Sequence, residues 1–275
     1  MLGAMIGDIV GSRFEWDNHR SKEFELFTDE CFATDDTIMT LAVGKALLDS
    51  RPDWSDLSLQ AVRCMQEVGR PYPECGFGGS FYSWIYSDHP QPYNSFGNGA
   101  AMRVSACGFA AESLEEALFL SREVTKVTHD HPEGLKGAEA TVVAIYMARN
   151  GSTMQEIRDV IHQQYYPMNF TLDEIRDTYV FNETCQNTVP QALKAFFESD
   201  SFEDAIRNAI SVGGDSDTLA AITGGVAEAY YGVPAELEKR ALTYLDSNLL
   251  KIYHDVRGEG RFEWGKSKAI QARQE

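Results

Sequence analysis

The chain has 275 residues, which is enough for one large domain or two ordinary ones with a substantial core. Hydrophobic residues make up 43% and charged residues 24%, a composition typical of a globular protein rather than a disordered one. The net charge of −18 disfavours nucleic acid and anionic membranes as partners, because their phosphates would be repelled over most of the surface. A local pocket for one phosphorylated ligand is still allowed.

The cysteines and the N-terminus indicate the compartment. Five cysteines without CxxC spacing argue against a disulfide framework or a zinc ribbon, so we expect reduced thiols and a cytoplasmic location. The first apolar run lacks a basic region and is interrupted by Asp8, which argues against a signal peptide. No apolar run is long enough to span a bilayer.

Helical spacing of apolar residues dominates the chain. Ser113, Thr153 and Thr171 each stand three residues before a glutamate, the pattern of a capped helix start. Pro132 and Pro234 fit a first helical turn, where a missing N–H is tolerated. Helices are predicted over residues 36–49, 54–68, 114–129, 134–149, 154–165, 188–198, 202–211, 217–231 and 234–253.

Evidence for strands, repeats or linkers is thin. No alternating run of β-branched residues is bounded by hairpin turns, and no Pro- or Ser-rich segment divides the chain. Gly3, Gly7 and Gly11 lie on one face of an N-terminal helix, where each costs up to about 1 kcal/mol relative to alanine. That cost suggests close helix–helix packing. We predict an all-α fold with one compact multi-helix domain over residues 1–275.

The segment 71–103 differs from its surroundings because it is rich in Gly, Pro and aromatic residues. It reads as two long loops around a short helix, and such loops often carry function. Within it, Gly76–Ser80 and Ser95–Arg103 can expose backbone amides to a phosphate or ribose. Arg103 is among the few cations there. Neither stretch matches a Walker or Rossmann spacing, so each signal is weak alone.

Two acidic clusters, Thr34-Asp35-Asp36-Thr37 and Asp215-Ser216-Asp217-Thr218, each open a predicted helix. Acids at a helix start can act as simple caps, but one acid is enough for that role. If the fold brings the clusters together, four carboxylates repel one another, and neither cluster contains Lys or Arg. Hard divalent cations resolve this repulsion. Six oxygen ligands, enough for two ions with waters, are available from Thr34, Asp35, Asp36, Asp215, Asp217 and Thr218.

Two further positions are ambiguous by themselves. Glu15 stands between aromatic residues; it is either a solvated acid or, with a partner site, a general acid/base. His129 and His131 precede a proline-started helix, and the absence of a third nearby His or Cys argues against zinc. We interpret His129 as a substrate contact and His131 as a weaker candidate.

In this order the motifs resemble the ADP-ribosylhydrolase family, whose founding members include the dinitrogenase-reductase-activating glycohydrolase. The resemblance covers residues 3 to about 232. It rests on Gly3-Ala4 through Gly7-Asp8, Gly11-Ser12, Phe14-Glu15, Thr34-Asp35-Asp36-Thr37, Gly97-Asn98-Gly99-Ala100-Ala101-Met102-Arg103, Thr128-His129 and Gly213-Gly214-Asp215-Ser216-Asp217-Thr218.

The resemblance implies an all-α fold with two Mg²⁺ ions, or Mn²⁺, at the base of an ADP-ribose cleft. The six oxygen ligands above would hold the ions. The catalytic residues would be Glu15, Asp35 and Asp217, with Glu15 as acid/base or water-orienting group. The substrate-binding residues would be Gly76, Gly78, Gly79, Ser95, Phe96, Gly97, Asn98, Gly99 and His129.

The expected function is a magnesium-dependent hydrolase that removes ADP-ribose from a modified protein or other target. It would cleave the bond at the anomeric carbon of the distal ribose. Two alternatives stay open: a hydrolase acting on ADP-ribosylated nucleic acid or a small molecule, and a non-catalytic ADP-ribose-binding protein. A helical phosphohydrolase of the His/Asp type is a further alternative, which we disfavour. The sequence leaves open the linkage, the target, the choice between Mg²⁺ and Mn²⁺, and the oligomeric state.

Overall fold

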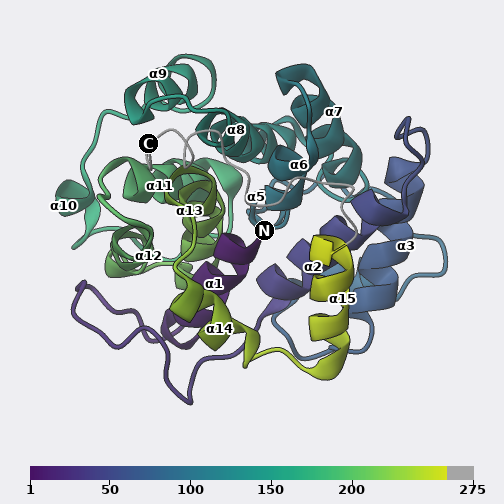
Figure 1. Cartoon of the computed structure of the whole chain (residues 1–275), viewed down its shortest axis with the longest axis horizontal. Coiled ribbons are helices and arrows are strands. Elements are labelled where there is room, and N and C mark those ends of the chain that lie inside the picture. Colours follow the sequence, from purple (N-terminus) through teal and green to yellow (C-terminus); the bar gives the residue numbers. More distant parts are fainter. Residues whose placement is uncertain (259–275) are drawn as a thin grey trace.

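The computed structural model describes residues 1–258, and this part of the chain is helical without a β-strand (Figure 1). The predicted all-α fold is confirmed; the predicted domain end at residue 275 lies outside the described residues. The elements are α1 (Leu2–Gly11), η1 (Ser12–Phe14), α2 (Asp35–Asp49), α3 (Leu57–Gly69), α4 (Gly79–Ile85), α5 (Gly99–Met102), α6 (Ser105–Ala110), α7 (Leu114–Thr125), α8 (Pro132–Arg149), α9 (Met154–Gln164), α10 (Leu172–Ile175), α11 (Cys185–Phe197), α12 (Phe202–Ser211), α13 (Ser216–Tyr231), α14 (Ala235–Leu242) and α15 (Ser247–Gly258).

Helix starts follow the predicted caps. The Ser113 hydroxyl accepts a hydrogen bond from the Glu116 amide at 3.0 Å, and full capping boxes form at Thr153 and Thr171. Pro132 occupies the first turn of α8. These local signals act because side-chain oxygens satisfy amides that have no partner inside the helix.

Two predicted helices end differently in the structure. The single helix predicted over 234–253 is wrong, because it divides into α14 and α15. The Asp246 carboxylate accepts from the amides of Asn248 and Leu249, both at 2.9 Å, which starts a new helix there. The helix predicted over 114–129 ends at Thr125, so that His129 lies in the loop before α8.

The centre of the fold is the contact between α1 and α13 (Figure 1). A β-carbon on Gly3 would lie 2.1 Å from the Gly224 carbonyl oxygen, and one on Gly7 would lie 1.9 Å from the Ala220 oxygen. Real side chains never approach backbone so closely, so only glycine permits this contact. The predicted close packing of the N-terminal helix is therefore confirmed. α1 is buried throughout.

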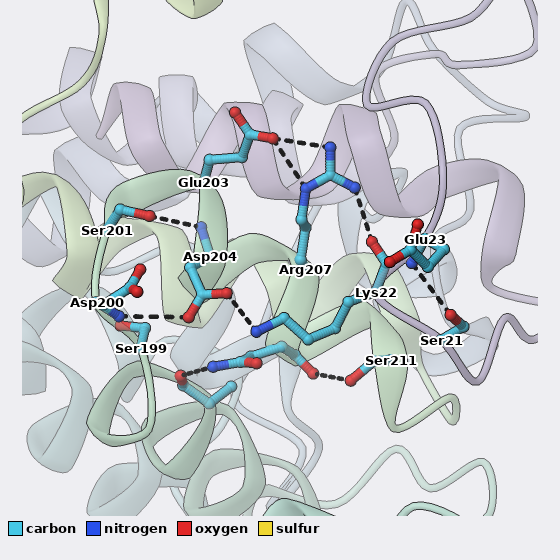
Figure 2. Close-up of polar contacts among 12 residues, drawn as sticks. Ser21, Lys22, Glu23, Ser199, Asp200, Ser201, Glu203, Asp204, Arg207 and Ser211 are labelled. Carbon is cyan, nitrogen blue, oxygen red and sulfur yellow. Dashed lines mark hydrogen bonds and ion pairs between the residues drawn. The ribbon is translucent and has the colours of Figure 1, made fainter.

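The loop between η1 and α2 is held against α12 by ion pairs and backbone contacts (Figure 2). Lys22 pairs with Asp204. Arg207 donates to the backbone carbonyls of Lys22 at 2.8 Å and Phe24 at 2.7 Å, while its guanidinium also pairs with Glu203. This anchoring fixes the path of the chain from Glu15 to α2.

Within residues 1–258, every helix is too short or too polar to cross a bilayer.

Candidate functional site

 

The structure brings together the two acidic clusters, which lie far apart along the sequence. The hydroxyl of Thr218, at the start of α13, donates to the Asp36 carboxylate at the start of α2 at 3.3 Å. Carboxylate oxygens of Asp8, Asp36 and Asp217 lie within 4.8 Å of one another, and so do those of Glu15, Asp215 and Asp217. Asp217 belongs to both groups. The helix N-termini of α2 and α13 thus converge on one acidic centre with the end of α1 and η1.

Asp8 is a member of this centre that sequence reasoning missed. Its buried carboxylate accepts hydrogen bonds from the Thr34 amide at 3.0 Å, the Thr34 hydroxyl at 2.6 Å and the Thr37 amide at 3.0 Å. The signal was present, because an acid in an otherwise apolar, glycine-rich helix needs a buried partner. In the sequence, Asp8 argued against a signal peptide and belonged to a family motif, but it was not predicted as a site residue.

Thr34 and Asp35 take different places at the start of α2. Thr34 does not line the cleft: its hydroxyl donates to Asp8 and accepts from the Asp36 amide at 3.2 Å. Asp35 faces the cleft, and its amide donates to the Cys75 carbonyl at 3.0 Å. A β-carbon on Gly76 would lie 2.8 Å from the Asp35 carboxylate, and Gly76 has φ of +115°. Glycine is therefore required beside Asp35.

Burial and mutual repulsion make these carboxylates hard to ionise. Burial raises the pKa of Asp8 to about 6, against the hydrogen bonds from Thr34 and Thr37. Burial, then the charges of Asp215 and Asp8, raise the pKa of Glu15 to about 7.

The remaining acids of the centre behave in the same way, with burial as the largest cause and neighbouring carboxylates next for most of them. Their pKa values lie above the ordinary range of an aspartate, and this group comprises Asp35, Asp36, Asp215 and Asp217. One oxygen of Asp36, Oδ1, is buried without a hydrogen-bond partner. Such a centre calls for positive charge.

A cleft of about 250 Å³ opens above the acidic centre. Asn98 ties the two together, because its amide donates to the Asp215 carboxylate at 2.7 Å and to the Thr188 hydroxyl at 3.2 Å. Phe96 does not line the cleft; its exposed ring lies 5.1 Å from the ring of His131, which caps α8. The predicted substrate-binding residues that do line it are Gly76, Gly78, Gly79, Ser95, Gly97, Asn98, Gly99 and His129.

One wall of the cleft comes from a segment without any recognisable motif. Phe181 and Glu183 line the cleft, and the Glu183 carbonyl accepts from the Asn98 amide at 2.7 Å. The next contact, from the Cys185 amide to the Phe96 carbonyl, measures 2.9 Å. These backbone hydrogen bonds hold the segment beside the cleft, a position that depends on the fold and not on a local motif. In sequence it is an ordinary polar loop.

Comparison with known proteins identifies the family. The ADP-ribosylglycohydrolase family matches residues 1–260, so the chain belongs to it. The mouse "ADP-ribosylhydrolase ARH3" is 22% identical over 85% of this chain and 83% of its own length. The "ADP-ribosylarginine hydrolase Tri1" of Pseudomonas putida is 24% identical over 85% of this chain and 70% of its own. The "ADP-ribosyl-[dinitrogen reductase] glycohydrolase" of Rhodospirillum rubrum is 26% identical over 82% and 76%.

A solved structure supports the fold. A chain described as "ADP-ribosylglycohydrolase-related protein complex" superposes with a TM-score of 0.63 and 22% identity, covering 93% of this chain and 95% of its own. The family match and the names of the relatives show that the protein is an enzyme of the ADP-ribosylhydrolase class, which removes ADP-ribose by hydrolysis.

Proposed function

We propose that the enzyme is magnesium-dependent and cleaves the bond between the anomeric carbon of the distal ribose and a modified protein. The single observation that carries this proposal is the buried acidic centre at the base of the cleft. Among residues 1–258 the cleft wall holds carboxylates from both helix starts, and Arg103 is its one Lys or Arg. The reduced state of all five cysteines supports a cytoplasmic location as part of the proposal.

The residues present fit two hard divalent cations. Asp and Thr oxygens are the donors that Mg²⁺ and Mn²⁺ prefer, and the unpartnered Asp36 Oδ1 is a buried acceptor that a cation would satisfy. The ions would be held by Asp36, Asp215, Asp217 and Thr218, with Asp35 at the cleft wall. Thr34 is a weaker candidate for a metal ligand, because its hydroxyl already donates a hydrogen bond to Asp8. When bound, the ions would supply positive charge that orients vicinal ribose hydroxyls.

The chain's own residues account for the remaining chemistry. A transition state of oxocarbenium character carries positive charge, which the carboxylates of the centre stabilise. Glu15 is half-buried and lines the cleft beside Asp215 and Asp217. In that position it can orient the attacking water and accept its proton.

Alanine at Gly78 tests whether the glycine loop holds the ligand. A β-carbon at Gly78 or Gly79 would meet no protein atom within 4 Å, so either substitution should leave the melting temperature within about 2 °C. If ADP-ribose approaches this backbone closely, we expect affinity to fall roughly tenfold or more, because the added methyl group displaces the ligand. Calorimetry with ADP-ribose measures the change. Unchanged affinity in both variants would remove this loop from the substrate site.

The decisive experiment for the proposed function is turnover of a panel of defined substrates. The panel would carry ADP-ribose on arginine, serine, an acidic side chain or a nucleic-acid base, with release of ADP-ribose followed in Mg²⁺, Mn²⁺ and excess chelator. We expect turnover of a protein-linked substrate in metal and none in chelator. Full turnover in chelator would refute the metal dependence. Tight binding of ADP-ribose without turnover of any linkage would instead indicate a non-catalytic binding protein.

The metal-free protein is expected to lose stability as the pH rises from 5 to about 7. Because the folded pKa values of Asp8 and Glu15 are raised to about 6 and about 7, the folded state binds more protons than the unfolded chain in this window. The contribution of these two groups to stability is therefore fully present below the unfolded values of about 4 and is lost as the pH passes the folded ones. Thermal unfolding in chelator at pH 5, 6, 7 and 8 checks the direction.

Magnesium should oppose this fall, because cations bind the deprotonated carboxylates. The gain in melting temperature on adding Mg²⁺ should therefore grow from pH 5 to pH 7. A melting temperature in chelator that rises over the same interval would contradict the raised pKa values.

A further inference from the structure

Arg103, which follows α5, is a buried cation that makes no ion pair, although the charge of Asp35 attracts it. Its side chain is 1% exposed, and no carboxylate of residues 1–258 lies within 4.0 Å of the guanidinium. Its Nε has no hydrogen-bond partner. The guanidinium lies 5.5 Å from the Phe81 ring centroid and borders the cleft. Burying an unpaired charge is costly, so this arrangement needs an explanation beyond packing.

Arg103 sets the direction of a hydrogen-bond chain that ends on His129. Its Nη2 donates to the Thr128 hydroxyl oxygen at 2.6 Å, and that hydroxyl lies 2.7 Å from His129 Nδ1. A guanidinium can only donate, so Thr128 accepts from it. The Thr128 hydroxyl proton has two acceptors within reach, Nδ1 at 2.7 Å and the Thr125 carbonyl at 3.4 Å, and the shorter contact favours Nδ1. Arg103 Nη2 also approaches Nδ1 directly, at 3.5 Å. Nδ1 is therefore an acceptor and carries no proton.

The orientation of the ring follows from the same contacts. Rotating the imidazole by a half turn would put a ring carbon 2.7 Å from the Thr128 oxygen, which is closer than such atoms approach. The other nitrogen, Nε2, has no protein partner among residues 1–258, and His129 lines the cleft. β-carbons on Gly97 and Gly99 would lie 3.5 and 3.4 Å from Nε2. Glycines thus leave space in front of this atom.

We propose that Arg103 and Thr128 are positioning residues that hold His129 as a neutral imidazole whose Nε2–H points into the cleft. The donor fits an oxygen acceptor of the ligand, a phosphate or ribose oxygen. The ligand's identity rests on the proposed function, whereas the protonation state of the ring does not. Burial, and then the charge of Arg103, lower the pKa of His129 well below its usual value, which agrees with a neutral ring. His129 consequently donates a hydrogen bond and takes no part in acid–base steps.

Nitrogen-15 NMR of the imidazole rings tests the protonation state in the free, full-length protein. We expect His129, assigned by its loss in His129→Gln, to show a protonated Nε2 and an unprotonated Nδ1 from pH 5.5 to 8. A proton on Nδ1, or a ring that becomes doubly protonated in this range, would overturn the proposal. Because the measurement needs no ligand and no turnover, it decides the matter even if the proposed function fails.

Variants of Arg103 separate positioning from structure. Arg103→Lys keeps a group that can only donate and should preserve the Nε2–H form, whereas Arg103→Met allows Nδ1 to carry the proton. The same form in both variants would show that Arg103 does not set it. If Arg103→Met does not fold, the spectra of the unmodified protein and of Arg103→Lys still decide: a proton on Nδ1 in either one overturns the proposal.

A matched pair at His129 tests the donor itself. The glutamine amide of His129→Gln can replace the Nε2–H donor, while His129→Leu has similar size but no donor. With Mg²⁺ present, we expect ADP-ribose affinity to fall about tenfold or more in His129→Leu and clearly less in His129→Gln. Equal losses would remove the donor role. Absence of ADP-ribose binding in the unmodified protein would count against the proposed function, and the NMR result would still stand.

Discussion

Asp217→Asn is expected to stabilise the metal-free protein and to abolish its hydrolase activity. Asp217 is shared by both groups of carboxylates, and its pKa is raised well above the usual value by burial and by the charges of Asp215 and Asp36. Removing a repelled buried charge should raise the melting temperature in chelator by a few degrees at pH 7.5. Loss of this proposed metal ligand should lower turnover roughly a hundredfold or more and suppress the stabilisation by Mg²⁺.

Asp173→Asn is the matched control, because Asp173 is 87% exposed and pairs with Arg176 away from the cleft. Neither turnover nor the response to Mg²⁺ should change in this variant. Thermal unfolding with and without metal, together with ADP-ribose release, measures both effects. An Asp217→Asn protein that is less stable in chelator yet still gains stability from Mg²⁺ would argue that Asp217 is structural.

Gly7→Ala is expected to be the most destabilising single-methyl change in the contact between α1 and α13. The new β-carbon would lie 1.9 Å from the Ala220 carbonyl oxygen and 2.2 Å from its carbonyl carbon. Backbone atoms cannot move aside as a side chain can, so the helices must separate. We expect a loss of about 3 kcal/mol or more in the free energy of unfolding. Denaturant unfolding measures it.

Because α1 carries Asp8 and α13 carries Asp217, the separated helices should also bind Mg²⁺ more weakly. Gly44→Ala is the matched control, since Gly44 is also a buried helical glycine. Its β-carbon would meet only side-chain atoms, Met1 Sδ at 3.1 Å and Val256 Cγ1 at 3.2 Å. A change within about 1 kcal/mol is expected there. Similar losses in both variants would contradict the special role of Gly7.

Much of the fold could be predicted because its signals are local. The caps at Ser113, Thr153 and Thr171 depend on residues three positions apart, and the structure contains all three. The break between α14 and α15 escaped prediction because apolar spacing continues across it. There, Asp246 starts a new helix through a side-chain contact that competes with helix continuation.

The site was predictable only where a motif marked it. Both acidic clusters are short runs of the same residue types, and these types predicted a shared cation site on the condition that the fold brings the clusters together. Asp8 lacked such a pattern, because its partners are amides of Thr34 and Thr37 in another helix. Phe181 and Glu183 line the cleft only because the backbone near Asn98 holds their segment. Long-range contacts of this kind leave no trace in local sequence.

The pairing of α1 with α13 has a consequence for the order of events during synthesis. α1 leaves the ribosome early, but the helix that covers its glycine face begins only at Ser216. Until then the nascent chain holds Asp8 and the 34–37 cluster without their counterparts, so that the proposed cation site cannot form. Such distant closure slows folding and leaves apolar surface exposed meanwhile. Activity should therefore emerge abruptly once α13 has been synthesised, rather than grow with chain length.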